Sequence, residues 1–282
     1  MPLALITGAS TGIGRATALR LSDRGWTVLA GVRDPAAGER LALEAKAGTV
    51  MPIALEVTDP AQIAEAAERV RHEVARSTGG GLDALVNNAG IGIGGPLELI
   101  VAEDLQRQFD VNVFGQIAVT KAMLPALRSA CGRIVFVSSI GGRVAMAFTA
   151  PYAASKHAVE AFADALRVEL HRSKVKVALI EPGSVATPIW DKSRSEADKV
   201  TIPPQLQEYY GRVPAAMDKA LADTAARGVP PEQVAETIER ALTSSRMRSR
   251  YVVGRDARAM LIAKSVLSDH LFDRVARRVL GV

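Results

Sequence analysis

The segment Leu3-Ala4-Leu5-Ile6-Thr7-Gly8-Ala9-Ser10-Thr11-Gly12-Ile13-Gly14 decides the fold of this chain. Its first four residues form an apolar run that predicts a strand, and a helical pattern follows the glycines as far as Gly25. Glycines at such a strand–turn–helix junction permit a tight turn. They also let a diphosphate approach the free N–H groups at the helix N-terminus. The segment therefore predicts a dinucleotide site.

The same residues also match a hydrolase signature. Gly8-Ala9-Ser10-Thr11-Gly12 fits the G-x-S-x-G elbow that exposes a nucleophilic serine. That elbow requires earlier strands to supply an oxyanion loop, and only seven residues precede Gly8. A hydrolase built on Ser10 is therefore a distant alternative.

Strand and helix patterns alternate along the rest of the chain. Further strands are predicted at 27–32, 50–57, 82–86, 133–137 and 250–253, and one long helix, straight or bent, at 97–127. Alternation of this kind requires parallel strands with crossover helices. We therefore predict an α/β fold: one doubly wound parallel sheet of the Rossmann type with helices on both faces, in a single domain over 1–282.

The residues at the end of the second predicted strand indicate whether the chain prefers NAD(H) or NADP(H). An acidic residue there accepts the ribose hydroxyls of NAD, whereas an arginine accommodates the additional phosphate of NADP. The sequence offers both, as Arg33-Asp34-Pro35. Asp34 before a proline is typical of a helix N-cap, which would leave Arg33 for the phosphate. We predict NADP(H) in preference to NAD(H).

Composition restricts the class of protein. The chain has 282 residues, 48% of them hydrophobic, a net charge of +5 and one cysteine, Cys131. A single cysteine fits a reducing compartment, and neither a signal peptide nor a membrane-spanning run is visible, so we expect a cytoplasmic protein. Aromatic residues (4%) are not interleaved with basic ones, so we expect no nucleic-acid partner. The four histidines lack ligand spacing, so we predict no metal site.

Tyr152 and Lys156 stand four residues apart in a stretch that predicts a helix. Residues at this spacing share one helical face. A lysine there favours the phenolate and lowers the pKa of the tyrosine, and its stem can reach a sugar hydroxyl. A free tyrosine titrates near ~10, so acid–base catalysis near neutral pH requires a large shift. The spacing alone also fits an ordinary surface pair.

Further motifs accompany this pair. They are Thr7-Gly-x-x-x-Gly-x-Gly14, Asn87-Asn-Ala-Gly90, Asn112, Ser139 thirteen residues before Tyr152, and Pro182-Gly183 with Thr187. In this order and spacing they resemble the short-chain dehydrogenase/reductase family, over residues 3–190 and less distinctly over 230–253. The resemblance implies hydride transfer between a nicotinamide and a carbinol or carbonyl carbon, coupled to proton exchange and without a metal.

The resemblance also implies a role for each matched residue. Tyr152 would exchange a proton with the substrate oxygen, Ser139 would hold that oxygen, Lys156 would bind the nicotinamide ribose, and Asn112 would anchor a water relay. Glu56-Val57 stands where the family usually has Asp-Val against adenine. The residues expected to bind the cofactor are Gly8, Ser10, Gly12, Ile13, Gly14, Arg33, Glu56, Val57, Asn88, Ala89, Gly90, Tyr152, Lys156, Pro182, Gly183, Val185 and Thr187.

Residues 188–228 are predicted to form a lid over the substrate. Large apolar side chains are expected on both sides of the substrate, and no cation is evident among them. We therefore predict a small hydrophobic alcohol or ketone, such as a steroid-, retinoid- or lipid-like compound. The lid candidates are Trp190, Leu206, Tyr209, Tyr210, Val213 and Met217, opposite Ile91, Ile93, Ile140, Val144, Met146 and Phe148.

Residues 256–282 are predicted to form a C-terminal helical extension, basic and amphipathic. We favour its packing on the protein or on a second subunit over contact with a membrane surface. A homodimer or homotetramer is expected, with small residues of 102–127 and 152–172 at the interface: Ala118, Ala122, Ala158, Ala161 and Ala165. The alternative function is a catalytically silent NADP(H)-sensing protein of the same fold.

Overall fold

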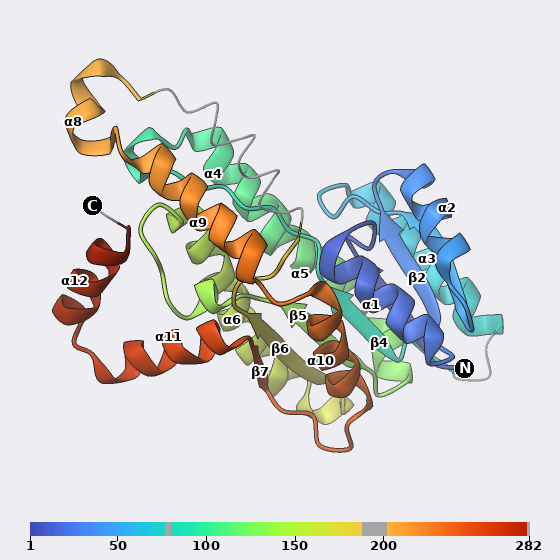
Figure 1. Cartoon of the computed structure of the whole chain (residues 1–282). Coiled ribbons are helices and arrows are strands. Elements are labelled where there is room, and N and C mark those ends of the chain that lie inside the picture. Colours follow the sequence, from blue (N-terminus) through green and yellow to red (C-terminus); the bar gives the residue numbers. More distant parts are fainter. Residues whose placement is uncertain (77–79, 188–201, 281–282) are drawn as a thin grey trace.

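A computed structural model describes residues 1–76, 80–187 and 202–280 (Figure 1). Within them seven parallel strands form one sheet in the order β3-β2-β1-β4-β5-β6-β7. This confirms the predicted fold class. The strands are β1 Leu3–Thr7, β2 Thr27–Val32, β3 Thr49–Ala54, β4 Ala84–Asn87, β5 Arg133–Val137, β6 Lys176–Pro182 and β7 Arg250–Val253.

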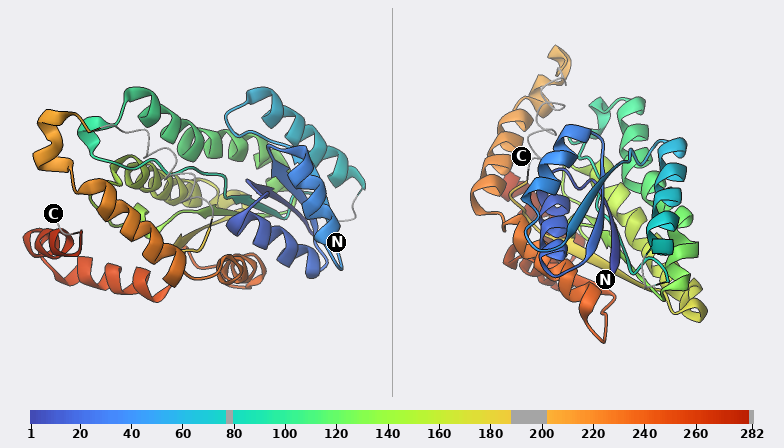
Figure 2. Two further views of the ribbon diagram at one scale, coloured as in Figure 1. Left: turned by 45° about the horizontal axis from the view of Figure 1, so that its top comes forward. Right: turned by 90° about the vertical axis from the view of Figure 1, so that its right-hand side faces the viewer.

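Helices cover both faces of the sheet (Figure 2). Helices α1, α2 and α10 pack on one face, and α3, α5 and α6 pack on the other. The α-helices are α1 Gly12–Asp23, α2 Pro35–Glu44, α3 Pro60–Arg76, α4 Ala102–Phe109, α5 Gln116–Ser129, α6 Ala150–Glu169, α8 Gln207–Tyr210, α9 Val213–Arg227, α10 Pro231–Thr243, α11 Arg255–Val266 and α12 Asp269–Leu280.

Both faces of the sheet are buried, as β1 illustrates. Ala4 and Ile6 belong to the core under α1 and α10, whereas Leu3 and Leu5 belong to the core under α3 and α5. Successive side chains of a strand point to opposite faces, so a strand that is buried on both sides reads as a continuous apolar run. The apolar run at the start of the chain therefore marks a central strand.

The strand order reverses between β1 and β4, the two strands on either side of the switch point. Chain segments leaving their carboxyl ends diverge, which opens a crevice where ligands bind in sheets of this type. The glycine turn leaves β1 there, and Asn88 follows β4. The fold thus brings two distant motifs to one edge.

The predicted helix over 97–127 is wrong in detail. Residues Leu97–Leu99 form a separate 3₁₀ turn, and α4 and α5 are joined by a π-helical segment, Asp110–Gly115. Asn112 lies within this segment. A π turn is one residue wider than an α turn and is frequent at functional sites, so the poor helix former marks a real irregularity.

Other boundaries also differ from the prediction. The described part of the C-terminal extension predicted over 256–282 is two helices, α11 and α12. The third strand ends at Ala54 rather than at residue 57, and the fourth is Ala84–Asn87 rather than 82–86. The sequence pattern predicts no separate strand over the residues that form β6.

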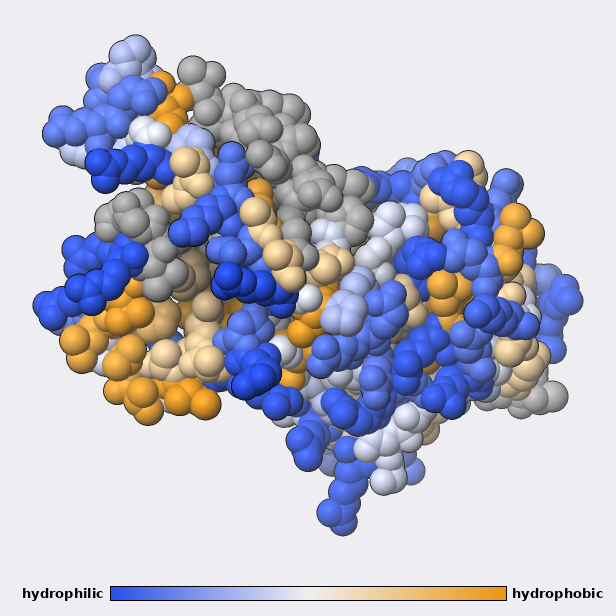
Figure 3. Space-filling view, viewed as in Figure 1, coloured by the Kyte–Doolittle hydropathy of each residue, from blue (hydrophilic) through white to orange (hydrophobic). Residues whose placement is uncertain are grey.

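The C-terminal extension leaves an apolar surface (Figure 3). Phe272 is buried, whereas Leu271 and Val275 of α12 and Ile262 and Val266 of α11 are exposed. Packing on the protein itself therefore covers only part of the tail. No helix within the described part of the chain is long and apolar enough to cross a membrane.

Candidate active site

A cavity of about 410 Å³ lies at the carboxyl ends of the strands. It brings together all but two of the predicted site residues; Gly14 and Asn112 do not line it. The predicted residues that do are Gly8, Ser10, Gly12, Ile13, Arg33, Glu56, Val57, Asn88, Ala89, Gly90, Ser139, Tyr152, Lys156, Pro182, Gly183, Val185 and Thr187.

The glycine turn has a backbone that other residues adopt only with strain. Gly8 and Gly12 have φ of +64° and +55°, in the left-handed region that favours glycine. A Cβ on Gly14 would lie 2.3 Å from the carbonyl oxygen of Gly8 and 2.5 Å from Nδ2 of Asn88. Gly14 thus allows α1 to begin directly against the turn, with its N-terminus at the cavity.

Polar side chains hold this turn against β4. The Oγ1 of Thr7 accepts hydrogen bonds from the backbone N–H groups of Asn88 and Ala89, both at 3.0 Å. The Nδ2 of Asn88 donates to the carbonyls of Thr7 and Gly8, also at 3.0 Å. Asn88 therefore has a structural role in addition to the cofactor contact expected from the sequence.

The adenosine end of the cavity contains Arg33. Asp34 caps α2, as predicted, since its Oδ1 accepts from the N–H of Ala36 at 3.0 Å with Pro35 in the first turn. The Nη1 of Arg33 lies 3.6 Å from Oε2 of Glu56. Glu56 also accepts from the N–H and hydroxyl of Thr58. Glu56 thus forms an ion pair with Arg33 at this end of the cavity.

Tyr152 and Ser139 form a hydrogen-bonded pair. The Oγ of Ser139 also accepts from the N–H of Gly141 at 3.0 Å, which fixes the turn Ile140–Gly142 after β5. Burial raises the pKa of Tyr152, and the hydrogen bond from Ser139 offsets part of this. This direction is opposite to the lowering expected from Lys156, because burial disfavours the charged phenolate.

Lys156 lies beside the tyrosine and is itself buried. Its Nζ is 5.7 Å from the centre of the Tyr152 ring and donates to the carbonyl of Val137 at 2.8 Å. Burial lowers the pKa of Lys156 to about 8, while the charge of Glu160 raises it. A charge that is partly lost near pH 8 stabilises a neighbouring phenolate less than a permanent one.

The Asn112 amide makes three hydrogen bonds within the protein. Its Oδ1 accepts from the N–H of Ile91 at 2.8 Å, and its Nδ2 donates to the carbonyl of Ile91 at 2.9 Å and to Oγ of Ser155 at 3.1 Å. The amide therefore ties the segment after β4 to α6. This arrangement gives a structural reason for an asparagine inside a helix, and the water relay expected from the sequence stays a prediction.

The cavity also includes residues that sequence reasoning missed. Arg107 and Val111 lie four residues apart on α4 and its π extension, and both line the cavity. Arg107 contradicts the expectation that no cation lies near the substrate; its Nη2 also contacts Asp104 at 2.9 Å. Its position follows from Gln108, which bonds the backbone of Ile91 and Ile93. The other missed residues are Thr11, Leu55, Gly92, Val137 and Ser138.

The predicted substrate face is only partly present. Ile91 and Ile93 line the cavity, whereas Ile140, Val144, Met146 and Phe148 are not among its lining residues. The predicted lid residue Trp190 lies outside the described residues. The remaining lid candidates, Leu206, Tyr209, Tyr210, Val213 and Met217, do not line the cavity either.

The cavity suits a dinucleotide. A glycine turn at a helix N-terminus would bind the diphosphate, and the Lys156 amine and Tyr152 phenol lie at the other end of the same groove. Comparison with known proteins agrees, since residues 2–198 match the family model described as short chain dehydrogenase. The chain belongs to the short-chain dehydrogenase family.

Known members extend the similarity over nearly the whole chain. A retinol dehydrogenase 5 from Mus musculus is 36% identical over 98% of this chain and 87% of its own. An NADPH-dependent 3-dehydrocapnine reductase from Ornithobacterium rhinotracheale is 32% identical over 98% of this chain and 96% of its own.

A solved short-chain dehydrogenase/reductase from Burkholderia phymatum, in complex with NAD, is 26% identical. It covers 94% of this chain and 92% of its own, with a TM-score of 0.79. The short-chain dehydrogenase fold binds a nicotinamide cofactor, and the chain is an oxidoreductase of that family.

Proposed function

We propose that this short-chain dehydrogenase is an NADP(H)-dependent oxidoreductase that interconverts a hydrophobic secondary alcohol and its ketone, or an alcohol and its aldehyde. The observation that carries the proposal is the meeting of Ser139, Tyr152 and Lys156 with the glycine turn around one cavity. The names of the retinol dehydrogenase and 3-dehydrocapnine reductase relatives support alcohol–carbonyl chemistry.

Each side chain has one task in this mechanism. A bound nicotinamide would supply or accept the hydride. Ser139, fixed by the N–H of Gly141, orients the substrate oxygen. The Tyr152 phenol, which burial keeps protonated at neutral pH, donates its proton to the oxygen of a carbonyl substrate. Lys156 binds a ribose hydroxyl and stabilises the phenolate that forms as the proton leaves.

The preference for NADP(H) is supported by Arg33. Asp34 is engaged as a helix cap, and Arg33 projects into the cavity with its side chain 65% exposed. A guanidinium suits a phosphate because it forms two parallel charge-assisted hydrogen bonds. NADP(H) preference requires Arg33 to exchange Glu56 for the phosphate. One relative is named as NADPH-dependent and one related structure contains NAD, so a direct measurement is needed.

A titration with both cofactors tests this preference. Wild type should bind NADPH more tightly than NADH, and Arg33→Gln should weaken NADPH binding by about tenfold or more while leaving NADH nearly unchanged. Arg40→Gln, which removes an exposed arginine that contacts Asp34, is the matched control. Tighter NADH binding by wild type would refute NADP(H) preference.

The substrate is proposed to be hydrophobic, with a lid formed by residues 188–228. Ile91, Ile93 and Val111 give the inner wall an apolar character. Within the described part of this lid, the Tyr210 hydroxyl donates to Glu98 Oε2 at 2.9 Å. This contact ties α8 to the 3₁₀ turn Leu97–Leu99.

An absorbance assay at the nicotinamide band tests the activity. We expect turnover of bulky apolar ketones or alcohols by wild type and a loss of about 10²–10⁴-fold in Tyr152→Phe. Exclusive turnover of small charged substrates would contradict the hydrophobic class. Loss of that turnover in Arg107→Gln would identify Arg107 as the cation that binds them. A folded wild type that binds NADPH but converts no substrate would favour the silent sensor.

A homodimer or homotetramer is part of the proposal. The outer sides of the π-helical segment Asp110–Gly115, of α5 and of α6 expose Phe114 and Phe162, together with Ala118, Ala161 and Ala165. Ala122 and Ala158 instead pack against the chain's own core. Phe162→Glu should dissociate the oligomer in a sedimentation experiment, whereas Tyr209→Glu on α8 should not. We retain a cytoplasmic location, as predicted from the single cysteine, within the same proposal.

A further inference from the structure

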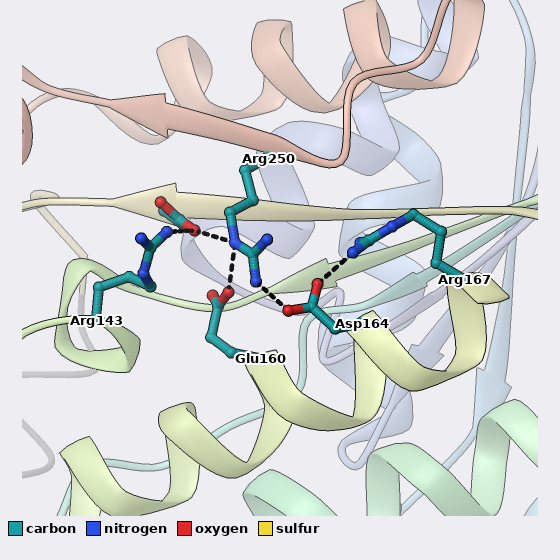
Figure 4. Close-up of polar contacts among 6 residues, drawn as sticks. Arg143, Glu160, Asp164, Arg167 and Arg250 are labelled. Atoms are coloured by element: carbon teal, nitrogen blue, oxygen red, sulfur yellow. Dashed lines mark hydrogen bonds and ion pairs between the residues drawn. The ribbon is translucent and has the colours of Figure 1, made fainter.

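Helix α6 carries further charged residues on the C-terminal side of Tyr152 and Lys156. Tyr152, Lys156, Glu160 and Asp164 follow one another at intervals of four, so they form one stripe along the helix. The first two line the cavity. The last two bind an arginine from β7 (Figure 4). The mechanism proposed above uses Tyr152 and Lys156 and assigns no function to Glu160 and Asp164.

Arg250 joins Glu160 and Asp164 of α6 to the sheet. Its Nε lies 3.0 Å from an oxygen of Glu160 and 3.0 Å from an oxygen of Glu181 on β6. Its Nη2 donates to Asp164 at 2.7 Å, and Arg143 reaches the same oxygen of Glu181 at 3.2 Å. Glu160, Glu181 and Arg250 form one ion cluster, in which both carboxylates are buried and the Arg250 side chain is 26% exposed.

Lys156 and Glu160 are buried one helical turn apart. In the part of the chain that the structure describes, the buried charged residues are Lys156, Glu160 and Glu181, with exposed fractions of 4%, 5% and 0%. Arg250 pairs with both carboxylates, and Arg143 also pairs with Glu181. Buried charges are tolerated when paired. The Glu160 carboxylate, one turn along α6, favours the charged form of Lys156.

The cluster also connects to the catalytic segments. Glu181 directly precedes Pro182 and Gly183 of the cavity wall, and Arg143 directly follows the 3₁₀ turn that begins after Ser139. Lys156 is held by the Val137 carbonyl at the end of β5. The catalytic helix and both neighbouring segments therefore share one set of ion pairs.

We propose that Glu160, held by Arg250, is a positioning residue of the reaction, which keeps the Lys156 amine charged and aligned against the Val137 carbonyl. Its role in catalysis rests on the function proposed above. The groups that face Glu160 are Arg250 on β7, Glu181 on β6 and Ser138 at the end of β5. Those that face Lys156 are Tyr152 and Glu160 on its own helix.

Competitive labelling of lysine amines, read by peptide mass spectrometry across a pH series, tests the first step without turnover. Lys156 lines the cavity, so a small acylating reagent can reach it, and exposed Lys121 is an internal reference. In wild type the midpoint for Lys156 should lie at about 8. In Glu160→Gln it should fall by about 0.5 to 1, the effect of one partly neutralised charge a helical turn away.

Asp164→Asn is the matched control. It removes a carboxylate that binds the same arginine but lies one turn further from Lys156, so the midpoint should stay within about 0.2 of wild type. An unchanged midpoint in Glu160→Gln, or an equal fall in both variants, would overturn the proposal. If Glu160→Gln does not fold, Glu160→Asp should give a smaller fall in the midpoint, and no fall would overturn it.

A second measurement tests the link to catalysis. In Glu160→Gln the alkaline decline of kcat should begin at lower pH by the same interval, with KM for the carbonyl substrate nearly unchanged. A shifted labelling midpoint with an unshifted rate profile would overturn the catalytic role of Glu160. Absence of turnover in wild type would refute the proposed function, while the labelling result would still stand.

Discussion

Replacement of Asn112 by leucine separates a structural from a catalytic role. Leucine keeps nearly the same volume but removes three hydrogen bonds, two to Ile91 and one to Ser155. Each is worth about 1 kcal/mol net, and the N–H of Ile91, which is left unpaired, adds about 1–2 kcal/mol more. The Ile91 carbonyl keeps its hydrogen bond from Gln108. We therefore expect the free energy of unfolding to fall by about 4–5 kcal/mol. Over 282 residues this lowers Tm by roughly 7–8 °C.

Urea denaturation and thermal melting followed by circular dichroism measure this loss. Gln106→Leu is the control, because Gln106 makes one exposed hydrogen bond to Asp110 on the same helix and should change stability by less than about 0.5 kcal/mol. If Asn112→Leu stays within about 1 kcal/mol of wild type while turnover collapses, the anchoring role is refuted and the water relay is supported.

Three further predictions concern the same site. Gly14→Ala should weaken NADPH binding by about tenfold or more in calorimetry, because its Cβ would lie 2.3 Å from the Gly8 carbonyl; unchanged affinity would show that the turn adapts. Asp34→Ala should lower the free energy of unfolding by about 1 kcal/mol in urea, through loss of the cap on Ala36. In the protein without cofactor, the Tyr152 phenol should titrate above its ordinary pKa because burial disfavours its anion. Difference absorbance against Tyr152→Phe measures this, and a midpoint below about 10 would contradict it.

The fold and the two ends of the cavity could be predicted because their signals are local. An apolar run before three glycines is typical of a strand and turn at a phosphate site, and an Asp-Pro pair is typical of a helix start. β1 confirms the first prediction, and the Asp34 cap of α2 confirms the second. The family motifs added the positions of Ser139, Tyr152 and Lys156, which the structure brings to one cavity.

Contacts between distant segments could not be predicted in this way. Arg107 reads as a surface residue of an amphipathic helix, yet it lines the cavity because Gln108 fixes α4 against residues 91–93. The direction of the Tyr152 pKa was predicted wrongly, since a sequence shows the neighbouring lysine but not the burial.

The sequence by itself determined the alternation of strands and helices, the glycine turn and the spacing of Tyr152 and Lys156 on α6. These follow from backbone preferences and from periodicity along one segment, which are properties of neighbouring residues. Only the tertiary structure decided that Glu160, Glu181 and Arg250 share one buried site beneath Lys156. Burial and charge pairing depend on which segments the sheet places side by side, and residues 90 positions apart carry no mutual signal along the chain.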